Sequence, residues 1–395
     1  TVIRGGTGVF VFPIGVNGGL AVNQQGFSQT TQYQATTNNY LSPANALSNP
    51  FPSGIQQPPG SSLGLRTFLG QSVTFFNPAP GNAYSVRWVL GIQRQLPGNM
   101  VLEAAYIGNH SVHLPIESTQ LNAVPQAYLS KSPVRDQATI NLLGSSVPNP
   151  FAGLLPGSTS LNGSSVNLGQ LLLPFPQYPN NGVVMQQNGA GSSYYESLNA
   201  RLQKRFSGGV SLITNFIWSK LIDRVVYLNA YDVAPEKRVS TDSRPLRFVT
   251  AFTYQLPVGK GKLINLAPGW KDGLLGGWVL NGIYTWQLGA ALSWGNVIYY
   301  GGDVHLNPRQ VDGPAFDTTR FNTISAQQLA SNIRTFPSTF NNLRADGINT
   351  LNASVIKKFH FTERKYLQVR LEAFNTLNRP AFAAPNVSPT SSSFG

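Results

Sequence analysis

The stretch Tyr84-Ser85-Val86-Arg87-Trp88-Val89-Leu90-Gly91-Ile92-Gln93 alternates, with few exceptions, between large apolar residues and polar or small ones. In a β-strand, successive side chains point to opposite faces, so this period of two predicts one apolar and one polar face. The turn sequence Leu96-Pro97-Gly98-Asn99 follows, and residues 102–106 repeat the alternation. The sequence therefore predicts a β-hairpin here.

The same unit recurs three times along the chain. The predicted hairpins cover residues 194–219, turning at 207–209, residues 246–288, with a longer connection at about 257–275, and residues 350–375, turning near 362–364. A further strand is predicted near residues 2–12. We therefore expect about nine strands.

Long segments rich in Asn, Ser, Gly and Pro separate the hairpins, at about residues 13–83, 110–193, 220–245 and 291–349. Long and short connections alternate, so all long loops should emerge on one side, as in outer-membrane barrels. Strands of about 10 residues can cross a bilayer when tilted. The predicted fold class is all-β: an antiparallel up-and-down transmembrane β-barrel, partial, with about nine strands of a larger barrel.

Alternation alone does not say whether the apolar face contacts lipid or a second sheet. A soluble β-sandwich, in which two apolar faces pack together as a core, is the alternative fold. The two folds differ in whether those faces are buried against each other.

Composition narrows the class of protein. Charged residues make up 11% of the 395 residues, against roughly 25% in ordinary soluble domains. The chain has no cysteine, which excludes disulfides and thiolate sites. The net charge is +13, but the basic residues are spread along the chain and form no basic block, so no nucleic-acid partner is expected.

No apolar run is as long as a membrane-spanning helix requires. The opening residues, Thr1-Val2-Ile3-Arg4, do not have the pattern of a signal peptide.

If the apolar faces contact lipid, the charged residues of the polar faces should point into the barrel lumen, because charge on the lipid face is costly. The lumen-facing candidates are Arg87, Glu103, Arg201, Arg205, Arg247, Arg370 and Glu372. Aromatic side chains on the other face suit the membrane interfaces. The interfacial candidates are Trp88, Tyr106, Trp218, Tyr254, Trp278 and Trp286.

No catalytic or metal motif stands out. His110 and His113, at the predicted end of a strand, are expected to be loop histidines without metal partners. The run Gly259-Lys260-Gly261-Lys262 lacks the spacing of a phosphate-binding loop. We therefore expect no enzyme activity, no metal and no cofactor.

Four stretches carry a resemblance to a known family. They are residues 84–97 with Glu103-Ala104-Ala105-Tyr106-Ile107-Gly108-Asn109, residues 194–206 with Trp218-Ser219-Lys220, Arg247-Phe248-Val249 with Leu275-Gly276-Gly277-Trp278, and Arg370-Leu371-Glu372-Ala373-Phe374-Asn375-Thr376-Leu377-Asn378. Together they resemble the barrel of TonB-dependent outer-membrane receptors of the Oar-like, carboxypeptidase-regulatory-domain class. The resemblance covers most of the chain, in the family's order.

The resemblance implies a bacterial outer-membrane receptor that takes up an unidentified nutrient. Its partners would be outer-membrane lipid, the nutrient ligand, and the TonB complex through an N-terminal region. This sequence shows no plug or N-terminal domain and stops at Ser393-Phe394-Gly395 without the expected closing strand, so we expect residues 1–395 to be an incomplete C-terminal part of the barrel. A structural or adhesive surface barrel without transport is the alternative function. Carbohydrate, peptide and metal chelate all remain open as substrates.

Overall fold

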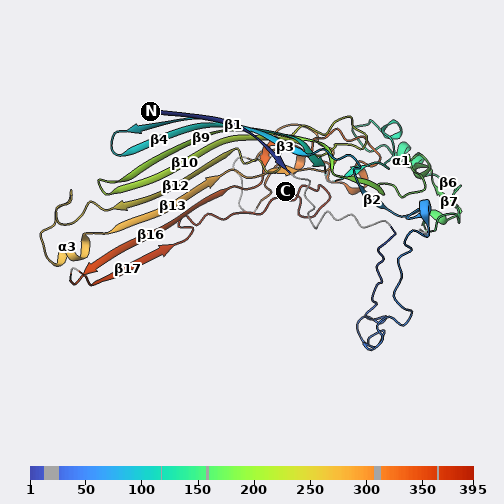
Figure 1. Cartoon of the computed structure of the whole chain (residues 1–395), viewed down its shortest axis with the longest axis horizontal. Helices are drawn as coiled ribbons and strands as arrows, with labels where there is room; N and C mark the ends of the chain where they lie inside the picture. The colour runs from blue at the N-terminus through green and yellow to red at the C-terminus, as the bar shows by residue number, and fades with distance from the viewer. Residues whose placement is uncertain (13–25, 117, 157–159, 307–312, 363) are drawn as a thin grey trace.

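One antiparallel sheet organises the chain (Figure 1). The computed structural model describes residues 1–12, 26–116, 118–156, 160–306, 313–362 and 364–395. In order across the sheet, the strands are β1 (Val2–Phe12), β3 (Ala83–Leu96), β4 (Met100–Ile116), β9 (Asn188–Ser207), β10 (Val210–Arg224), β12 (Leu246–Gln255), β13 (Val279–Gln287), β16 (Ile348–His360) and β17 (Tyr366–Ala373). Each pairs antiparallel with the next, which confirms the nine predicted strands and their up-and-down order.

Long and short connections alternate as predicted, and Figure 1 shows the long loops gathered at one end of the strands. Within the loops, a small sheet joins β2 (Val73–Phe76), β5 (Thr119–Gln120) and β8 (Val183–Gln186), and two pairs are formed by β6 (Ser146–Pro148) with β7 (Ser165–Asn167) and by β14 (Ala291–Ser293) with β15 (Thr339–Arg344). The two-residue β11 (Arg238–Val239) pairs with β10.

Helices are few and short: α1 (Gln137–Leu143), α2 (Leu168–Leu171) and α3 (Trp270–Leu275), with 3-10 turns at Gly64–Arg66, Gln126–Tyr128, Ser160–Asn162, Thr318–Arg320 and Ser325–Gln327. Across the described ranges, no helix combines the length and the apolar character needed to cross a membrane.

The loop boundaries differ from the prediction. The loop expected at 110–193 is shorter, because β4 continues to Ile116 and β9 begins at Asn188. Likewise, β10 continues to Arg224, and β16 begins at Ile348. Residues 188–193 are small or polar and give no apolar alternation, yet their backbones still pair with β4. Backbone hydrogen bonding does not require an apolar side chain, so strand ends of this composition escape a hydropathy pattern.

The register places the two predicted sets of side chains on opposite faces of the sheet. Trp88 lies in register with Gly108, and Leu90 with Tyr106, whereas Glu103 lies in register with Gln93 on one side and Arg201 on the other. Carried across the sheet, the alternation gives an apolar face, which bears the interfacial candidates Trp88, Tyr106, Trp218, Tyr254 and Trp286, and a polar face, which bears the seven charged candidates. Trp278 directly precedes β13 and lies outside the paired register.

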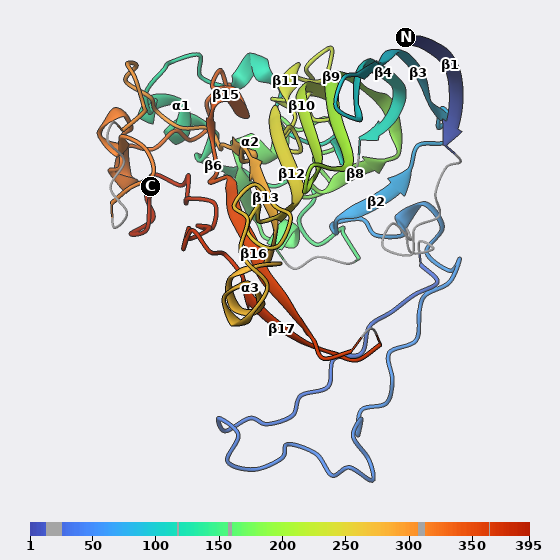
Figure 2. The same cartoon turned by 90° about the vertical axis from the view of Figure 1, so that its left-hand side faces the viewer.

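The apolar face is not covered by a second layer. Figure 2 shows a single open, curved sheet, and large side chains on this face remain exposed, among them Leu102 at 40% and Trp218 at 61%. A soluble protein rarely leaves so many contiguous apolar side chains in water. The sandwich alternative is therefore wrong, and the fold is that of a partial barrel.

Two glycines on the apolar face accommodate aromatic rings from the neighbouring strand. The Trp88 indole lies directly over Gly108, and the Phe252 ring lies over Gly282, so a Cβ atom at either glycine would clash with the ring. Glycine inside a strand commonly marks such a close approach. These pairs fix the orientation of two large aromatic groups on that face.

We predict that Leu202→Arg and Gln203→Arg, neighbours on β9 with side chains on opposite faces, differ strongly in their effect on insertion. An arginine on the apolar face near the middle of the bilayer costs about 2–4 kcal/mol, whereas the polar face tolerates it. The measurement is heat-modifiable gel migration of the full-length protein in isolated outer membranes. Equal yields of folded protein for the two variants would contradict the assignment of the faces.

Candidate functional site

The long loops pack against one another and form one body, which we call the loop cap. It consists of the described residues of 70–76, 118–187, 225–245, 288–347 and 386–395. Its hydrophobic core contains Leu292, Trp294, Val297, Phe316, Phe321 and Leu343, packed with Phe336, Phe340 and Phe394. The β13–β16 loop and the segment after β17 therefore share a hydrophobic core of their own, separate from the apolar face of the sheet.

Trp294 is the centre of this core. Its ring stacks on Phe321 with centroids 4.9 Å apart and meets Phe316, Phe336 and Phe340 edge-on at 5.3 to 6.0 Å. Aromatic pairs in these geometries contribute roughly 0.5–1.5 kcal/mol each beyond their area burial. The segment after β17 completes the core, since the Phe394 ring lies 5.3 Å from Phe316 and the Gly395 carbonyl accepts from the Ala315 N–H.

Polar contacts link every long loop to another. β2, in the β1–β3 loop, pairs with β8 in the β4–β9 loop. The Tyr231 hydroxyl, from the β10–β12 loop, accepts from the Ala123 N–H at 2.9 Å and lies within hydrogen-bonding distance of the Leu121 and Ala123 carbonyls. Ser130 N donates to the Ser331 carbonyl at 2.9 Å, which links the β4–β9 and β13–β16 loops.

Arg334 is a cation of the loop cap whose contacts join two loops. Its guanidinium donates to the carbonyls of Trp294 at 2.6 Å and Phe336 at 2.9 Å. Its backbone exchanges two hydrogen bonds with the Asn229 side chain, at 2.7 and 3.0 Å. Burial lowers the pKa of Arg334, but an arginine stays charged at any physiological pH. Arg334 thus joins the aromatic core to the β10–β12 loop.

Asp136 fixes the start of α1 within the cap. Its carboxylate accepts from the Ser130 hydroxyl at 2.7 Å and, as N-cap, from the Thr139 N–H at 3.1 Å. The hydrogen bond from Ser130 and those from Thr139 lower the pKa of Asp136 to about 2. The carboxylate is therefore ionised at every pH that the cell surface meets.

A cleft of about 340 Å³ opens in the loop cap between residues 118–121 and residues 226–232, with Asn181 at its edge. Its lining includes Tyr227, whose hydroxyl accepts from the Asn188 side-chain amide at 3.4 Å, and Asp232, whose carboxylate accepts from the Gln126 side-chain amide at 2.7 Å. Tyr231 adopts a φ of 66°, a left-handed backbone conformation that is uncommon for a tyrosine; the contacts of its hydroxyl with residues 121–123 hold it there. Hydrogen-bonding groups in a preformed cleft suit a small polar ligand.

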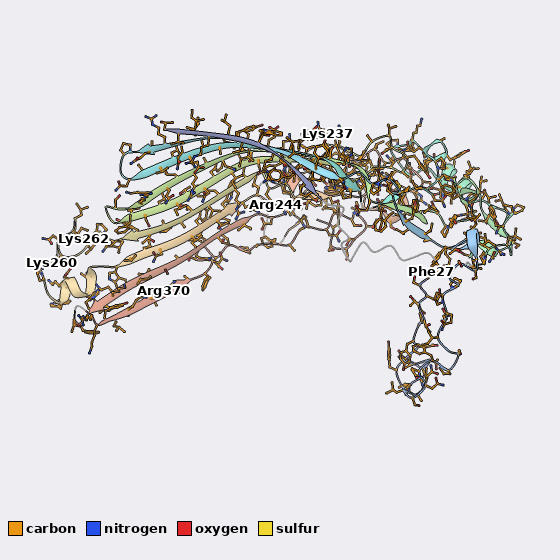
Figure 3. The ribbon with its side chains drawn as sticks, viewed as in Figure 1. Phe27, Lys237, Arg244, Lys260, Lys262 and Arg370 are labelled. Atoms are coloured by element: carbon orange, nitrogen blue, oxygen red, sulfur yellow. The ribbon has the colours of Figure 1, made fainter. Side chains whose placement is uncertain are left out.

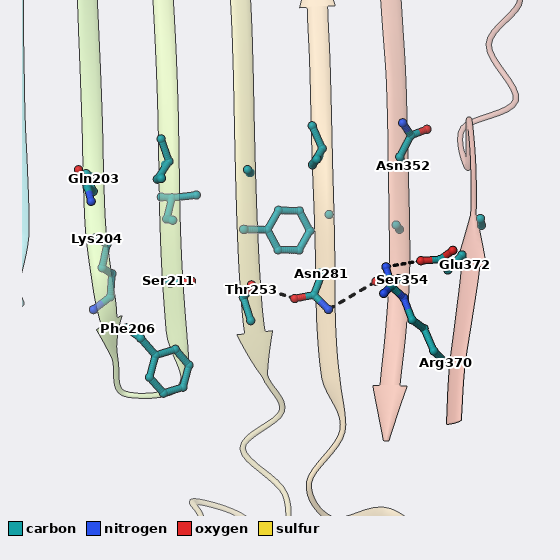
Figure 4. Close-up of a pocket in the computed structure, with 18 of the residues that line it drawn as sticks. Gln203, Lys204, Phe206, Ser211, Thr253, Asn281, Asn352, Ser354, Arg370 and Glu372 are labelled. Atoms are coloured by element: carbon teal, nitrogen blue, oxygen red, sulfur yellow. Dashed lines mark hydrogen bonds and ion pairs between the residues drawn. The ribbon is translucent and has the colours of Figure 1, made fainter. Parts of the chain in front are cut away.

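A second cleft, of about 660 Å³, lies mainly on the polar face near the short-turn end of the strands (Figure 4). A row of polar side chains crosses it in register, comprising Ser211, Thr253, Asn281, Ser354 and Glu372. Thr253 donates to the Asn281 Oδ1 at 2.8 Å, Asn281 reaches the Ser354 Oγ at 3.4 Å, and Glu372 forms an ion pair with Arg370. These hydrogen bonds join β12, β13 and β16 across the polar face, and the ion pair lies beside them on β17.

The seven charged candidates share the polar face but do not form one cluster. Glu103 and Arg201 are register partners, and Arg370 pairs with Glu372, whereas Arg247 lies beside Ile217 and Gln287. Val89, Ile107, Ile213 and Ile283 also lie on this face, so it is mixed in character.

Sequence reasoning missed several charged residues on the apolar face, including Arg94, Glu196, Lys204, Lys220 and Lys357. Glu196 and Lys220 are register partners there, near the loop end of the strands, and Glu196 accepts a hydrogen bond from the Tyr106 hydroxyl at 2.7 Å. The residue spacing contained the signal, because residue 196 has the same parity as the apolar Leu198 and Leu202. A carboxylate that accepts a hydrogen bond from a tyrosine is tolerated at a membrane interface better than at the bilayer centre.

The expectation that His110 and His113 are loop residues is wrong, because β4 extends beyond both. His110 stacks on Tyr194 with ring centroids 3.9 Å apart, and His113 lies 6.0 Å from the Tyr84 ring. Within the described parts of the chain, no group of three or more potential metal ligands comes together.

The whole chain, residues 1–395, matches the family described as outer membrane beta barrel domain. The protein belongs to this family and is a protein of the bacterial outer membrane. It matches no curated protein sequence.

Solved structures with some similarity include the outer membrane transporter YddB from Escherichia coli, at 10% identity and a TM-score of 0.36, covering 79% of this chain and 31% of the transporter. Another is the ferripyoverdine receptor of Pseudomonas aeruginosa bound to ferripyoverdine, at 10% identity and a TM-score of 0.34, covering 80% of this chain and 26% of the receptor. The chain thus spans less than a third of the length of these two proteins.

We predict that Arg334→Ala loosens the loop cap but leaves the sheet intact. The variant leaves the Trp294 and Phe336 carbonyls without their donor, and each unsatisfied buried group costs about 1–3 kcal/mol. Hydrogen exchange should therefore accelerate in residues 226–239 and 334–340 of the full-length protein, while β9 and β10 keep their protection. Lys237→Ala, at an exposed site of the β10–β12 loop that Arg334 contacts through Asn229, is the control. Unchanged exchange in Arg334→Ala would show that the loops are held together by other contacts.

Proposed function

We propose that this chain is part of the barrel of a TonB-dependent receptor of the Oar-like class, which captures a nutrient at the cell surface and admits it through the barrel. The family establishes an outer-membrane barrel domain. The finer assignment rests on the four stretches of residues that resemble these receptors, each of which lies on a paired hairpin of the sheet or beside one. In this proposal the chain is a carrier and not an enzyme.

The proposed orientation follows from the two faces of the sheet. The apolar face, with its exposed leucines and aromatic rings, contacts lipid, because acyl chains offer no hydrogen bonds to polar groups. The polar face, with the seven charged candidates, lines the lumen. This face carries both charged and apolar side chains. We therefore propose that it hydrates the lumen and contacts a plug supplied by the rest of the protein.

The observation that carries the proposal is the loop cap, which places a preformed polar cleft at one end of the strands. Loops held on a rigid scaffold commonly carry binding function, and hydrogen bonds between the loops reduce the ordering that a ligand must impose. Tyr227 and Asp232 are among the residues that line this cleft, so the ligand we propose is small and polar. Energy for uptake would come from TonB, through the N-terminal region of the whole receptor.

Uptake by cells that express the full-length protein tests the proposal. The probes are a radiolabelled ferric hydroxamate chelate, a maltodextrin and a casein-derived peptide mixture, which represent the three open substrate classes. We expect one of them to accumulate in cells with functional TonB and to remain at the surface without it. Tyr227→Phe, which removes one hydroxyl from the cleft, should weaken binding by up to about tenfold, whereas the exposed Tyr40→Phe should not.

Surface binding without TonB-dependent accumulation of any probe would contradict transport. The alternative, a structural or adhesive surface barrel, would then be favoured. One observation suits that alternative: the segment 26–60 projects from the cap as a finger closed at its base by the Gly60 N–H and the Gly26 carbonyl, 2.8 Å apart (Figure 1). Its exposed side chains include Tyr40 and Leu41.

A further inference from the structure

The connection between β12 and β13, residues 256–278, is the longest on the short-turn side of the sheet, and it folds back over the apolar face. The contact of Lys357 places it there, and a second contact holds Trp278 against α3 within the segment. Lys357, on the apolar face by its register with Val369, donates to the Gly276 carbonyl. Trp278 donates its indole N–H to the Leu274 carbonyl of α3 at 2.9 Å. We call residues 256–278 the α3 connection.

The α3 connection exposes large apolar side chains. Trp270 is 75% exposed and Leu263 89% exposed, and Ile264, Leu274 and Leu275 are each more than half exposed. Nothing within the described residues covers them, although they lie beside a face that is itself apolar. A short segment of this composition is typical of chains that lie in the membrane interface, with rings and leucines among the upper acyl chains.

The same segment is cationic. It carries Lys260, Lys262 and Lys271 against the single acid Asp272, and Asp272 is occupied as an acceptor for the Lys260 N–H at 2.8 Å. The Lys271 ammonium lies 5.8 Å from the Trp270 ring centroid. Lys262 lies 3.4 Å from the Gln255 amide oxygen. None of the three lysines forms an ion pair within the described part of the chain.

A cleft of about 510 Å³ lies between this segment and the end of β16. Its walls include Lys260, Lys262, Lys357 and Lys358 together with Gly259 and Gly276. Figure 3 shows Lys260 and Lys262 at one end of the molecule, beyond the strands and well away from Lys237. In the proposed orientation this end reaches the periplasmic leaflet of the membrane.

We propose that the α3 connection is a binding site for an anionic phospholipid, with phosphatidylglycerol as its occupant. The lysines contact the phosphate at the level of the head group, while Trp270 and Leu274 contact the acyl chains below it. The proposal rests on the orientation in which the apolar face contacts lipid. An acidic protein would satisfy the lysines but not the exposed rings and leucines beside the lipid-facing surface, so a lipid fits both features.

The charge complementarity is specific for an anionic head group. Each lysine near a membrane surface favours an anionic lipid by about fivefold. Phosphatidylethanolamine, which is zwitterionic, offers the same acyl chains without the net charge. Comparison of the two lipids therefore separates the head-group contact from insertion of the apolar side chains.

Fluorescence quenching in vesicles tests the site. The full-length protein is reconstituted in phosphatidylethanolamine vesicles that contain a small fixed fraction of brominated phosphatidylglycerol or brominated phosphatidylethanolamine. The difference between the parent protein and Trp270→Phe isolates the signal of Trp270. We expect stronger quenching by brominated phosphatidylglycerol, and relief of that quenching by unbrominated phosphatidylglycerol but not by unbrominated phosphatidylethanolamine.

The double variant Lys260→Gln/Lys271→Gln should lose most of this preference, with Lys237→Gln at the loop end as the matched control. Heat-modifiable migration verifies that each variant is folded in the vesicles. Equal quenching of Trp270 by the two brominated lipids would overturn the head-group assignment, and so would a double variant that keeps the preference of the parent. Absence of quenching by either lipid would show that α3 does not contact the membrane.

Discussion

The antiparallel backbone ladder is the constraint on which this structure depends. Across nine strands, each residue's neighbours are set by register, so one alternating sequence per strand determines two chemically different surfaces. A shift of one residue in any strand would exchange its faces. The tight turns, such as Gly208-Gly209 with positive φ at both glycines, help to hold that register. The ladder also satisfies the backbone groups that hydrocarbon could not.

The strands and faces could be predicted from the sequence because both follow from a local period. Trp218 and Arg247, for example, lie on the faces that their parity predicts, because one residue cannot change face without displacing its whole strand. The ends of β4 and β9 could not be predicted. Residues 188–193 pair through their backbones and leave no hydropathy signal.

The candidate site was less accessible to prediction, because its contacts join residues far apart in sequence. Asn229 meets Arg334, and Ser130 meets Ser331, across segments whose composition indicates only loop. Trp294, Phe316 and Phe321 carry no periodicity that would mark them as a core. The cationic, apolar character of residues 256–278 is visible in the sequence, but only the contact between Lys357 and Gly276 places that segment over the apolar face.

The reciprocal bond between Asn229 and the Arg334 backbone has a mechanical consequence for the surface of the protein. The β10–β12 and β13–β16 loops share these partners. Separating them would break the bond between Asn229 and Arg334 and would weaken the contacts of the Arg334 guanidinium with the Trp294 and Phe336 carbonyls. Motion of the β10–β12 loop is therefore coupled to motion of the β13–β16 loop, and the two loops move together about the points where they rejoin their strands.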